Sequence, residues 1–375
     1  MSKVNIYNIG PEDFQIPELE YYITKPDDPS EGHFRISLNF INAIRRIGIR
    51  PNVHIQNKYG IRFQFGKALK NGRRNTIIHI LNVDEFRFLH IKLFSKISAG
   101  SLKVIKHVFY PYPYVKTAPS CIAHIRGNIL RSDFLDGITL SSELVNSYLK
   151  MIDVKNSKIH FINIPVDEEF FFPSELVRHQ ARLRINIPID KKVVLYIGQI
   201  EPVRGAFELL RAFKMIVQDF PAKLVFATPC SEYEKKFWTK FNKLTKELNI
   251  QDHVIIIGRV ENINELYNMA DVVVLPFQEP YKITDPPLTV LEALSCAKPL
   301  ITTPYGTIKF IVKNRINGFI SDPAAEEIAS TVSEVLNMDE EDLSKIKQRA
   351  RETILTKFSL KVVGRQLVRL YSLYR

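Results

Sequence analysis

The sequence is poor in cysteine, and its few thiols are far apart. Among 375 residues only Cys121, Cys230 and Cys296 are present, and no two of them form a CxxC pair. An odd number of isolated cysteines argues against a disulfide framework and against a cysteine-ligated zinc site. Since no carboxylates are clustered at metal-ligand spacing either, we expect no bound metal and no cofactor. The cysteine pattern indicates reduced thiols and predicts a cytoplasmic protein.

Long hydrophobic runs are also missing. No apolar stretch approaches the roughly 20 residues that cross a bilayer. The opening MSKVNIYNIGPEDF contains neither an apolar signal core nor a small-residue cleavage site, so we expect no secretion signal. With 45% hydrophobic and 25% charged residues, the composition is typical of a globular protein. The length is sufficient for two domains.

Acidic residues are nearly absent from one part of the chain. Between Gly32 and Ser132 there are 18 Lys and Arg residues against two acids, Asp84 and Glu85, which gives this segment a charge of +16. The whole chain carries +12, so the remainder carries −4. Such a one-sided excess favours an anionic partner: phosphate, nucleic acid or an acidic membrane surface. We expect no nucleic acid, because no recognisable binding motif accompanies the charge.

A basic amphipathic stretch lies inside this segment. Residues 86–107, FRFLHIKLFSKISAGSLKVIKH, mix apolar positions with Arg87, Lys92 and Lys96. Such a helix packs on a domain's sheet in the commoner case, and in the other it lies on an anionic membrane. The basic N-terminal half therefore predicts a peripheral association with the cytoplasmic membrane face as an alternative to a purely cytoplasmic location.

The second half alternates between short β-branched runs and helical patterns. The apolar runs are KKVVLYIGQ (191–199), AKLVFATP (222–229), HVIIIGRV (253–260), ADVVVLPF (270–277) and KPLITTP (298–304). Segments with helical periodicity separate them, at 204–220, 231–248 and 262–270. Continuously apolar strands are typical of a parallel sheet buried on both faces. The alternation therefore predicts a doubly wound α/β domain.

The first half has a similar, less regular pattern. Its first strand is either KVNIYNI (3–9) or YYITKP (21–26), and a helix follows at 34–48. Further strands are expected at 75–83, 102–109, 136–142 and 158–166, with a Ser-capped helix at 141–152. We predict an N-terminal domain at 1–166, an irregular interdomain linker at 167–190, a C-terminal domain at 191–355 and a final helix at 356–375. Tandem domains of this kind enclose a ligand cleft between their carboxyl-edge loops.

Four segments together carry a family resemblance. They are KIHFINIPVDEEFFFP (158–173), LYIGQIEPVRGAFELLRAF (195–213), HVIIIGRVENINELYNMADVVVLPF (253–277) and TDPPLTVLEALSCAKPLITT (284–303). In order and spacing this set, within residues 137–318, resembles glycosyltransferase family 4. These are retaining enzymes with two Rossmann-like domains that face a cleft (the GT-B fold). The resemblance implies metal-independent transfer of a hexose from a UDP- or GDP-linked donor to a hydroxyl acceptor, and a final helix that crosses back to the N-terminal domain.

The resemblance also assigns donor-binding roles. Glu292 falls on the family's ribose-binding Glu, and Arg204 falls on its donor-phosphate Lys, in a loop that begins with Gly198. Gln199 replaces the Arg partner of that Lys. The loop that contains Gly258 and Val260 resembles the family's nucleobase-side loop.

The start of the segment 284–303 departs from the family pattern. Thr284 takes the place of the Glu that contacts the donor sugar, and the adjacent Asp285 is expected to supply the missing carboxylate. Pro286 and Pro287 replace a Phe-Gly pair and remove two backbone donors. The amides of Leu288 and Thr289 remain at the predicted helix start, where they suit phosphate or sugar oxygens. The seven-residue spacing from Asp285 to Glu292 predicts that both lie on one side of that helix.

The N-terminal half carries two further expectations from the resemblance. Gly32, in DPSEGHFRISL, matches the glycine loop that approaches the diphosphate, and His107, in VIKHVFYPYPY, matches the family's active-site His. His79 is the competing histidine, and we expect it to pack at a strand end. The predicted partners are a nucleotide sugar and a glycan or lipid-linked acceptor. The alternatives are a non-catalytic nucleotide-sugar-binding or partner subunit and a related activity such as epimerisation.

Overall fold

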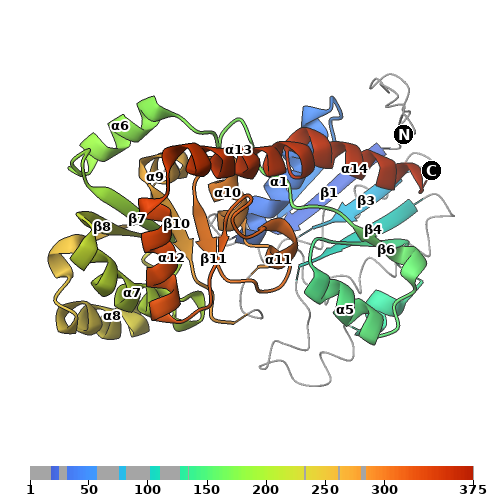
Figure 1. Cartoon of the computed structure of the whole chain (residues 1–375). Helices are drawn as coiled ribbons and strands as arrows, with labels where there is room; N and C mark the ends of the chain where they lie inside the picture. Colours follow the sequence, from blue (N-terminus) through green and yellow to red (C-terminus); the bar gives the residue numbers. More distant parts are fainter. Residues whose placement is uncertain are drawn as a thin grey trace, which may run out of the picture. The chain divides into compact units, whose positions relative to one another are not determined.

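The computed structural model describes residues 18–24, 32–56, 76–81, 102–109, 127–133, 135–231, 234–260, 262–279 and 284–374. The chain divides into two compact units, whose elements are labelled in Figure 1. The first combines Met1–Ser141, Val145–Pro165 and Leu360–Arg375, and the second combines Ser142–Leu144 and Val166–Ser359. The final helix therefore crosses back to the N-terminal unit, as the sequence predicts.

The first unit is built on a parallel sheet of six strands in the order β2-β1-β3-β4-β5-β6. The strands are β1 (Glu18–Thr24), β2 (Asn52–Gln56), β3 (Thr76–Ile80), β4 (Leu102–Val108), β5 (Gly137–Leu140) and β6 (Ile159–Phe161). Strand β1 contains the second of the two alternatives for a first strand, YYIT, whereas residues 3–9 lie outside the described residues. Helices described in this unit include α1 (Gly32–Arg46), α5 (Glu143–Met151) and α14 (Leu360–Ser372).

Helix α14 packs closely against α1. A Cβ atom on Gly364 would lie 2.3 Å from the carbonyl oxygen of Ala43, so only glycine permits this approach of the two helices. The hydroxyl of Tyr371, further along α14, lies 2.7 Å from Nδ1 of His79 on β3. The apolar face of this amphipathic helix is thus buried in the first unit.

The second unit contains a parallel sheet of six strands in the order β12-β11-β10-β7-β8-β9. The strands are β7 (Lys192–Ile197), β8 (Ala222–Ala227), β9 (Val254–Ile257), β10 (Val272–Leu275), β11 (Leu300–Thr302) and β12 (Phe319–Ile320). The helices are α6 (Glu175–Arg184), α7 (Ala206–Asp219), α8 (Lys235–Glu247), α9 (Ile263–Met269), α10 (Leu288–Ser295), α11 (Ile308–Ile311), α12 (Ala325–Asn337) and α13 (Glu340–Lys357).

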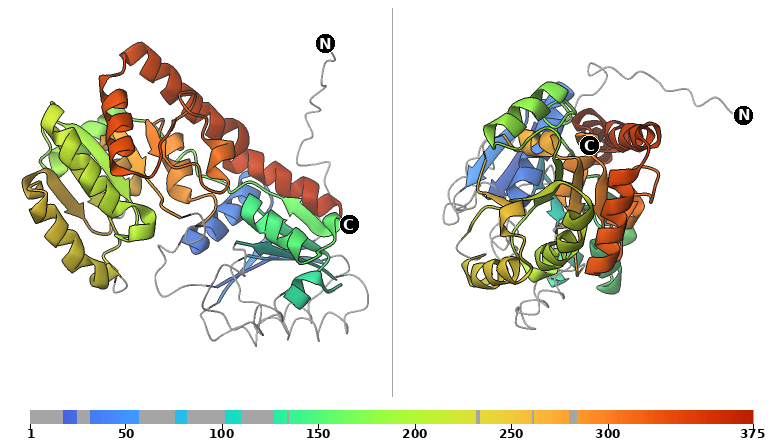
Figure 2. Two further views of the ribbon diagram at one scale, coloured as in Figure 1. Left: turned by 60° about the horizontal axis from the view of Figure 1, so that its bottom comes forward. Right: turned by 60° about the vertical axis from the view of Figure 1, so that its left-hand side comes forward.

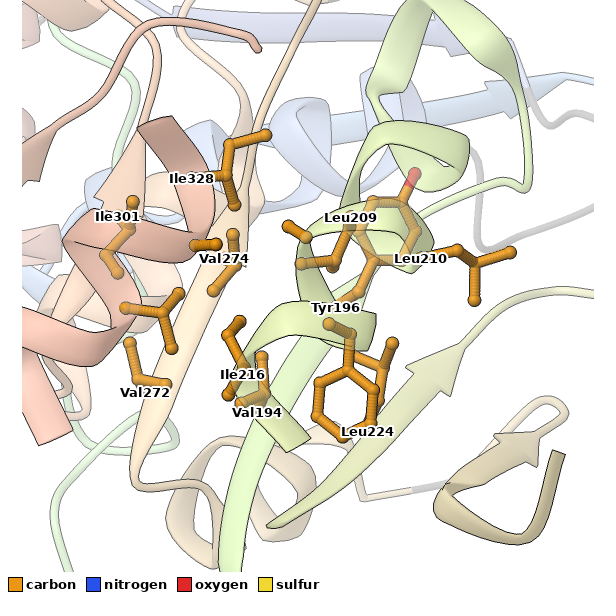
Figure 3. Packing of buried hydrophobic residues seen from close by; sticks show 14 of the residues in the cluster. Val194, Tyr196, Leu209, Leu210, Ile216, Leu224, Val272, Val274, Ile301 and Ile328 are labelled. Carbon is orange, nitrogen blue, oxygen red and sulfur yellow. The ribbon is translucent and has the colours of Figure 1, made fainter. Parts of the chain in front are cut away.

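The core of the second unit lies between this sheet and its helices (Figure 3). Val194 and Tyr196 of β7 pack with Leu210 of α7 and Ile328 of α12 on one face, where α7 and α12 lie side by side (Figure 2). Val193 and Leu195 alternate to the other face and are also fully buried. Helices α9 and α10 contact β7 and β11, respectively. Burial on both faces explains the uninterrupted apolar strands of this half.

The segment 167–190, expected to be irregular, contains helix α6. Ser174 caps it by accepting a hydrogen bond from the Val177 amide. Two arginines, Arg178 and Arg182, occupy inward positions, and both donate to the carboxylate of Asp271 over 2.6 Å. Because the arginines fill inward positions while Leu176 and Leu183 are exposed, the apolar residues of this helix do not mark its buried face. Within the described ranges, no helix is both long and apolar enough to cross a membrane.

Candidate functional site

The strand order of the second sheet reverses between β7 and β10, and ligands of such sheets bind at this point, beyond the carboxyl ends of the strands. The loops that follow the two strands contact each other. The Gln278 amide donates to the carbonyl of Val203 over 2.8 Å. Gly205 has φ of +78°, and a Cβ atom there would lie 1.9 Å from the carbonyl oxygen of Pro276. Only glycine fits at this position, which fixes the path of the loop after β7.

That loop places a cation at a helix start. Arg204 ends the 3₁₀ turn Pro202–Arg204, and Gly205 is the N-cap residue of α7. The guanidinium Nε of Arg204 lies 3.4 Å from a carboxylate oxygen of Glu201, and 27% of the Arg204 side chain is exposed. A helix N-terminus with an adjacent, partly exposed arginine suits a phosphate group. Arg204 therefore lies where the sequence predicts it, at the start of α7, the helix that follows the first strand of the second unit, β7.

A buried carboxylate that sequence reasoning missed holds this loop in place. Glu234, just before α8, accepts hydrogen bonds from the Ile200 amide over 2.8 Å and from the Ser231 amide over 2.6 Å. The hydroxyls of Thr228 and Ser231 also donate to it. It thereby joins the loop after β7 to the loop after β8. The Ser-x-x-Glu spacing of Ser231 and Glu234 is typical of a helix start, and this pattern could have identified Glu234 from the sequence.

Glu292 lies in the middle of α10 and is completely buried. The hydroxyl of Tyr267, on α9, donates to its Oε2 over 2.7 Å. This hydrogen bond fixes the orientation of the carboxylate. Tyr267 is also fully buried, and its ring packs against that of Phe171 at 5.9 Å between centroids. Sequence reasoning identified Glu292 but not Tyr267, because a tyrosine in an apolar helix is normally interpreted as core.

Asp285 lies outside helix α10, which begins at Leu288 after Pro287. The prediction that Asp285 and Glu292 share one side of this helix is therefore wrong. The Asp285 carboxylate accepts hydrogen bonds from the Thr307 amide (2.7 Å) and hydroxyl (2.8 Å) and from the Ser142 hydroxyl (2.5 Å). Burial raises the pKa of Asp285, and these hydrogen bonds oppose that shift. The carboxylate ties the start of α10 to the loop after β11.

The loop after β11 is shaped to accept Asp285. Gly306 has φ of +55°, and a Cβ atom on it would lie 2.6 Å from a carboxylate oxygen of Asp285. A side chain at this position would displace the carboxylate. Thr284, which precedes Asp285, and Thr289, in the first turn of α10, are both partly exposed, whereas Leu288 is buried.

The remaining predicted donor-binding residues lie in loops after neighbouring strands. Gly198 follows β7 with φ of +152°, and the carbonyl of Gln199 accepts a hydrogen bond from the Tyr196 hydroxyl over 2.7 Å. Gly258 and Val260 follow β9. A Cβ atom on Gly258 would lie 4.0 Å from the sulfur of Cys230, so the loops after β8 and β9 are adjacent. The carboxyl edge of one sheet thus brings these loops together.

The two histidines considered for the active site, His79 and His107, are buried in the sheet of the first unit. His107, near the end of β4, packs against Phe40 and Phe109, with ring centroids at 4.9 and 4.4 Å. The hydroxyl of Thr139, on β5, lies 3.0 Å from Nδ1 of His107 and 3.0 Å from Nε2 of His79. Burial, followed by the charge of Lys106, lowers the pKa of His79 to about 3. His79 thus packs within its strand, and the role of His107 stays a prediction.

Gly32, the other predicted residue of this unit, is the first residue of α1. Its place at a helix start, after β1, agrees with the position expected for a loop that approaches a ligand. The role of Gly32 also stays a prediction. Among the described residues, no group of three or more His, Cys, Asp or Glu side chains is arranged to hold a metal ion.

Residues 177–353 match the family model described as Glycosyl transferases group 1. The N-acetyl-alpha-D-glucosaminyl L-malate synthase of Bacillus anthracis is 26% identical over 253 residues, which are 68% of this chain and 63% of that protein. The D-inositol 3-phosphate glycosyltransferase of Mycolicibacterium smegmatis is 25% identical over 225 residues, which are 57% of this chain and 48% of that protein. The chain thus spans only about half to three fifths of these curated relatives.

Solved structures show the same fold over nearly the whole chain. HepE of Anabaena, solved in complex with UDP, has a TM-score of 0.78 at 13% sequence identity and covers 95% of this chain and 99% of its own. A glycosyltransferase of Rickettsia africae has a TM-score of 0.79 at 16% identity and covers 96% and 99%, respectively. At these identities the likeness establishes the fold, which is the two-domain GT-B architecture.

Proposed function

We propose that the protein is a glycosyltransferase that uses a nucleoside diphosphate sugar, a proposal supported by the match of residues 177–353 to the family model described as Glycosyl transferases group 1. One observation carries this proposal most directly. At the strand-order reversal, the close packing of Gly205 on Pro276 fixes a loop that presents Arg204 at the start of α7. A diphosphate is the ligand group that fits a cation beside a helix N-terminus.

The proposed donor is a UDP- or GDP-linked hexose. Arg204 and the amides at the start of α7 bind the diphosphate, and Glu292, oriented by Tyr267, binds the ribose hydroxyls. Leu288 and Thr289, at the start of α10, present amides to phosphate or sugar oxygens. HepE was solved with UDP-glucose, which supports a donor of this class in the same fold.

The proposed reaction transfers the hexose to a hydroxyl of the acceptor with retention of anomeric configuration. As the bond to the sugar breaks, negative charge develops on the departing diphosphate. A fixed cation and helix-start amides stabilise that charge without having to reorganise during the reaction. The acceptor is proposed to be a glycan or a lipid-linked, anionic molecule, and no metal takes part.

A thermal-shift panel tests the donor class directly. The full chain is heated with UDP, GDP, ADP, CMP and their common sugar conjugates, and a ligand at one hundred times its Kd adds about 2.7 kcal/mol of stability. We expect a shift with UDP or GDP and their conjugates, and a much smaller shift for Arg204→Ala. A panel without any shift would contradict both the donor site and the proposed function.

A second candidate function is a nucleotide-sugar-binding subunit without turnover. It is favoured by the start of α10, where Thr284 takes the place of a carboxylate and the oxygens of Asp285 are bound to Thr307 and Ser142. Release of free nucleoside diphosphate in the presence of a candidate acceptor separates the two. Binding of the donor without release, across a panel of glycan and lipid-linked acceptors, would support the second function.

A further inference from the structure

A small surface of the second unit combines exposed apolar and cationic side chains. Phe310 and Ile316 are large hydrophobic residues with 53% and 51% of their surface exposed. Lys309, Lys313 and Arg315 lie between and beside them and are exposed as well. We call these five residues the 309–316 patch; they belong to α11, labelled in Figure 1, and to the turn that follows it.

The patch is held in shape by the chain around it. The Ile316 amide donates to the carbonyl of Lys313 over 3.0 Å, and the Arg315 amide donates to that of Gly318 over 2.8 Å. The side chain of Asn317 is buried and donates to the carbonyl of Ile311 over 2.9 Å. These hydrogen bonds close the turn that carries Arg315 and Ile316.

The cations of the patch are placed next to its apolar side chains. Nζ of Lys309 lies 5.1 Å from the ring centroid of Phe310, and Nζ of Lys313 donates to the carbonyl of Lys309 over 3.2 Å. The Lys313 ammonium group therefore lies next to the backbone of Lys309, although Lys313 follows the end of α11. Glu334 pairs with Arg315 over 2.9 Å and offsets one of the three positive charges.

We propose that the 309–316 patch docks the protein on an anionic lipid bilayer. At such a surface, lysines contact headgroup phosphates while aromatic and aliphatic tips enter the boundary of the acyl region. A nucleic acid would contact the lysines but gains nothing from Ile316, and an isolated phosphate would not need Phe310. Charge complementarity together with two exposed apolar tips therefore favours a bilayer over either.

Docking at this patch has a consequence for the candidate site. The same segment begins with Gly306 and Thr307, which hold Asp285 at the start of α10. The 309–316 patch thus follows directly, along the chain, the loop that holds the start of α10. This position suits a lipid-linked acceptor. That consequence rests on the proposed function, whereas the docking itself is independent of it.

Co-sedimentation of the full chain with vesicles tests the proposal, without any donor present. Vesicles of phosphatidylcholine alone are compared with vesicles that also contain phosphatidylglycerol. We expect binding to the anionic vesicles only. In the variant Lys309→Ala/Lys313→Ala the partition constant should fall about 25-fold, since each lysine near an anionic surface contributes about fivefold. Phe310→Ala should lower it by about tenfold, through the lost apolar contact.

The matched control removes two lysines elsewhere on the same unit. Lys243 and Lys246 lie on the exposed side of α8, and Lys243→Ala/Lys246→Ala changes the net charge by the same amount. This control should bind anionic vesicles as the unaltered protein does. An equal loss of binding in both double variants would reduce the effect to net charge and overturn the proposal. So would unchanged binding of Lys309→Ala/Lys313→Ala, or unaltered protein that does not prefer anionic vesicles.

Two further readouts keep the outcomes distinct. Binding of duplex DNA that is lost in Lys309→Ala/Lys313→Ala, without any vesicle binding by the unaltered protein, would assign the patch to nucleic acid and overturn the bilayer. The thermal shift with UDP, measured on the same variants, should stay unchanged because the patch is exposed and does not include Arg204 or Glu292. A missing UDP shift in the unaltered protein would contradict the proposed function and leave the docking result standing.

Discussion

The two units share a six-stranded parallel sheet but use polar residues in opposite ways. In the second unit, Arg204 and Glu234 lie in the loops after β7 and β8, at the sheet edge where we propose that the donor diphosphate binds. In the first unit, His79 and His107 lie within β3 and β4 and are fully buried. The comparison teaches that two parallel sheets of equal size can place their polar side chains differently, in the loops beyond the strand ends in one unit and within the strands in the other.

Removing the cation of the second unit should give the largest effect. Arg204→Ala is expected to reduce donor turnover by about 10²–10³-fold, as the loss of one charge-stabilising donor does in other active sites. The melting temperature should barely change, because the side chain is partly exposed and its ion pair with Glu201 is long.

Arg211→Ala is the matched control for Arg204. Arg211, on α7, pairs with Glu208 over 2.6 Å and is 41% exposed. It should keep full turnover. If both variants retained full turnover, Arg204 would lose its proposed role. The difference in polar residues between the two units would then rest on Glu234 and Glu292 alone.

Gly205→Ala should give the next largest effect, on stability. The new Cβ atom meets the Pro276 carbonyl at a positive φ, so we expect a loss of about 3 kcal/mol in the free energy of unfolding. Gly48→Ala, in the first unit, also has positive φ but meets no atom within 4 Å, and it should cost only about 1 kcal/mol. Denaturant titration of both variants separates the clash from the strain. Equal losses would mean that the loop after β7 relaxes without harm.

The first unit should respond to acid. His79 is protonated with a pKa of 6.5 in the unfolded chain but only near pH 3 in the folded one, because it is buried. Between these values the unfolded state binds more protons, so stability falls as the pH drops below 6.5. At pH 5 the loss amounts to about 2 kcal/mol.

Chemical denaturation at pH 7 and pH 5 measures this dependence. His79→Gln should lose stability at pH 7, because its hydrogen bonds with Tyr371 and Thr139 change, but its additional loss at pH 5 should be smaller than that of the unaltered protein. An identical pH dependence in both would show that His79 is not the group that titrates.

Much of this architecture was predictable from the sequence. Strands such as VVLYI and VVVL are continuously hydrophobic and buried, and the loop after β7 was recognisable as a candidate phosphate loop because a glycine and a cation follow the strand. Helix α6 was missed because Arg178 and Arg182 fill its inward positions, and their partner Asp271 is distant in sequence. Asp285 was placed on a helix because spacing alone does not reveal that Pro287 delays the helix to Leu288.

The smallest predicted effect tests how Glu292 is held. Tyr267→Phe removes only the hydroxyl that donates to Glu292 Oε2, and the ring stays packed against Phe171. One hydrogen bond to a charged group is worth about 1.5 kcal/mol or slightly more, so UDP affinity should fall about tenfold if the bond orients the carboxylate for the ribose. The change should be in Kd, measured by calorimetry, with little change in turnover at saturating donor.

Tyr196→Phe is the matched control, since the Tyr196 hydroxyl donates to the Gln199 carbonyl in the same unit. Equal losses of affinity in the two variants would mean that both tyrosines act through the general packing of the sheet edge. A selective loss in Tyr267→Phe would make Glu292, although fully buried, a ligand-binding residue, and burial alone would then no longer separate the polar residues of the two units.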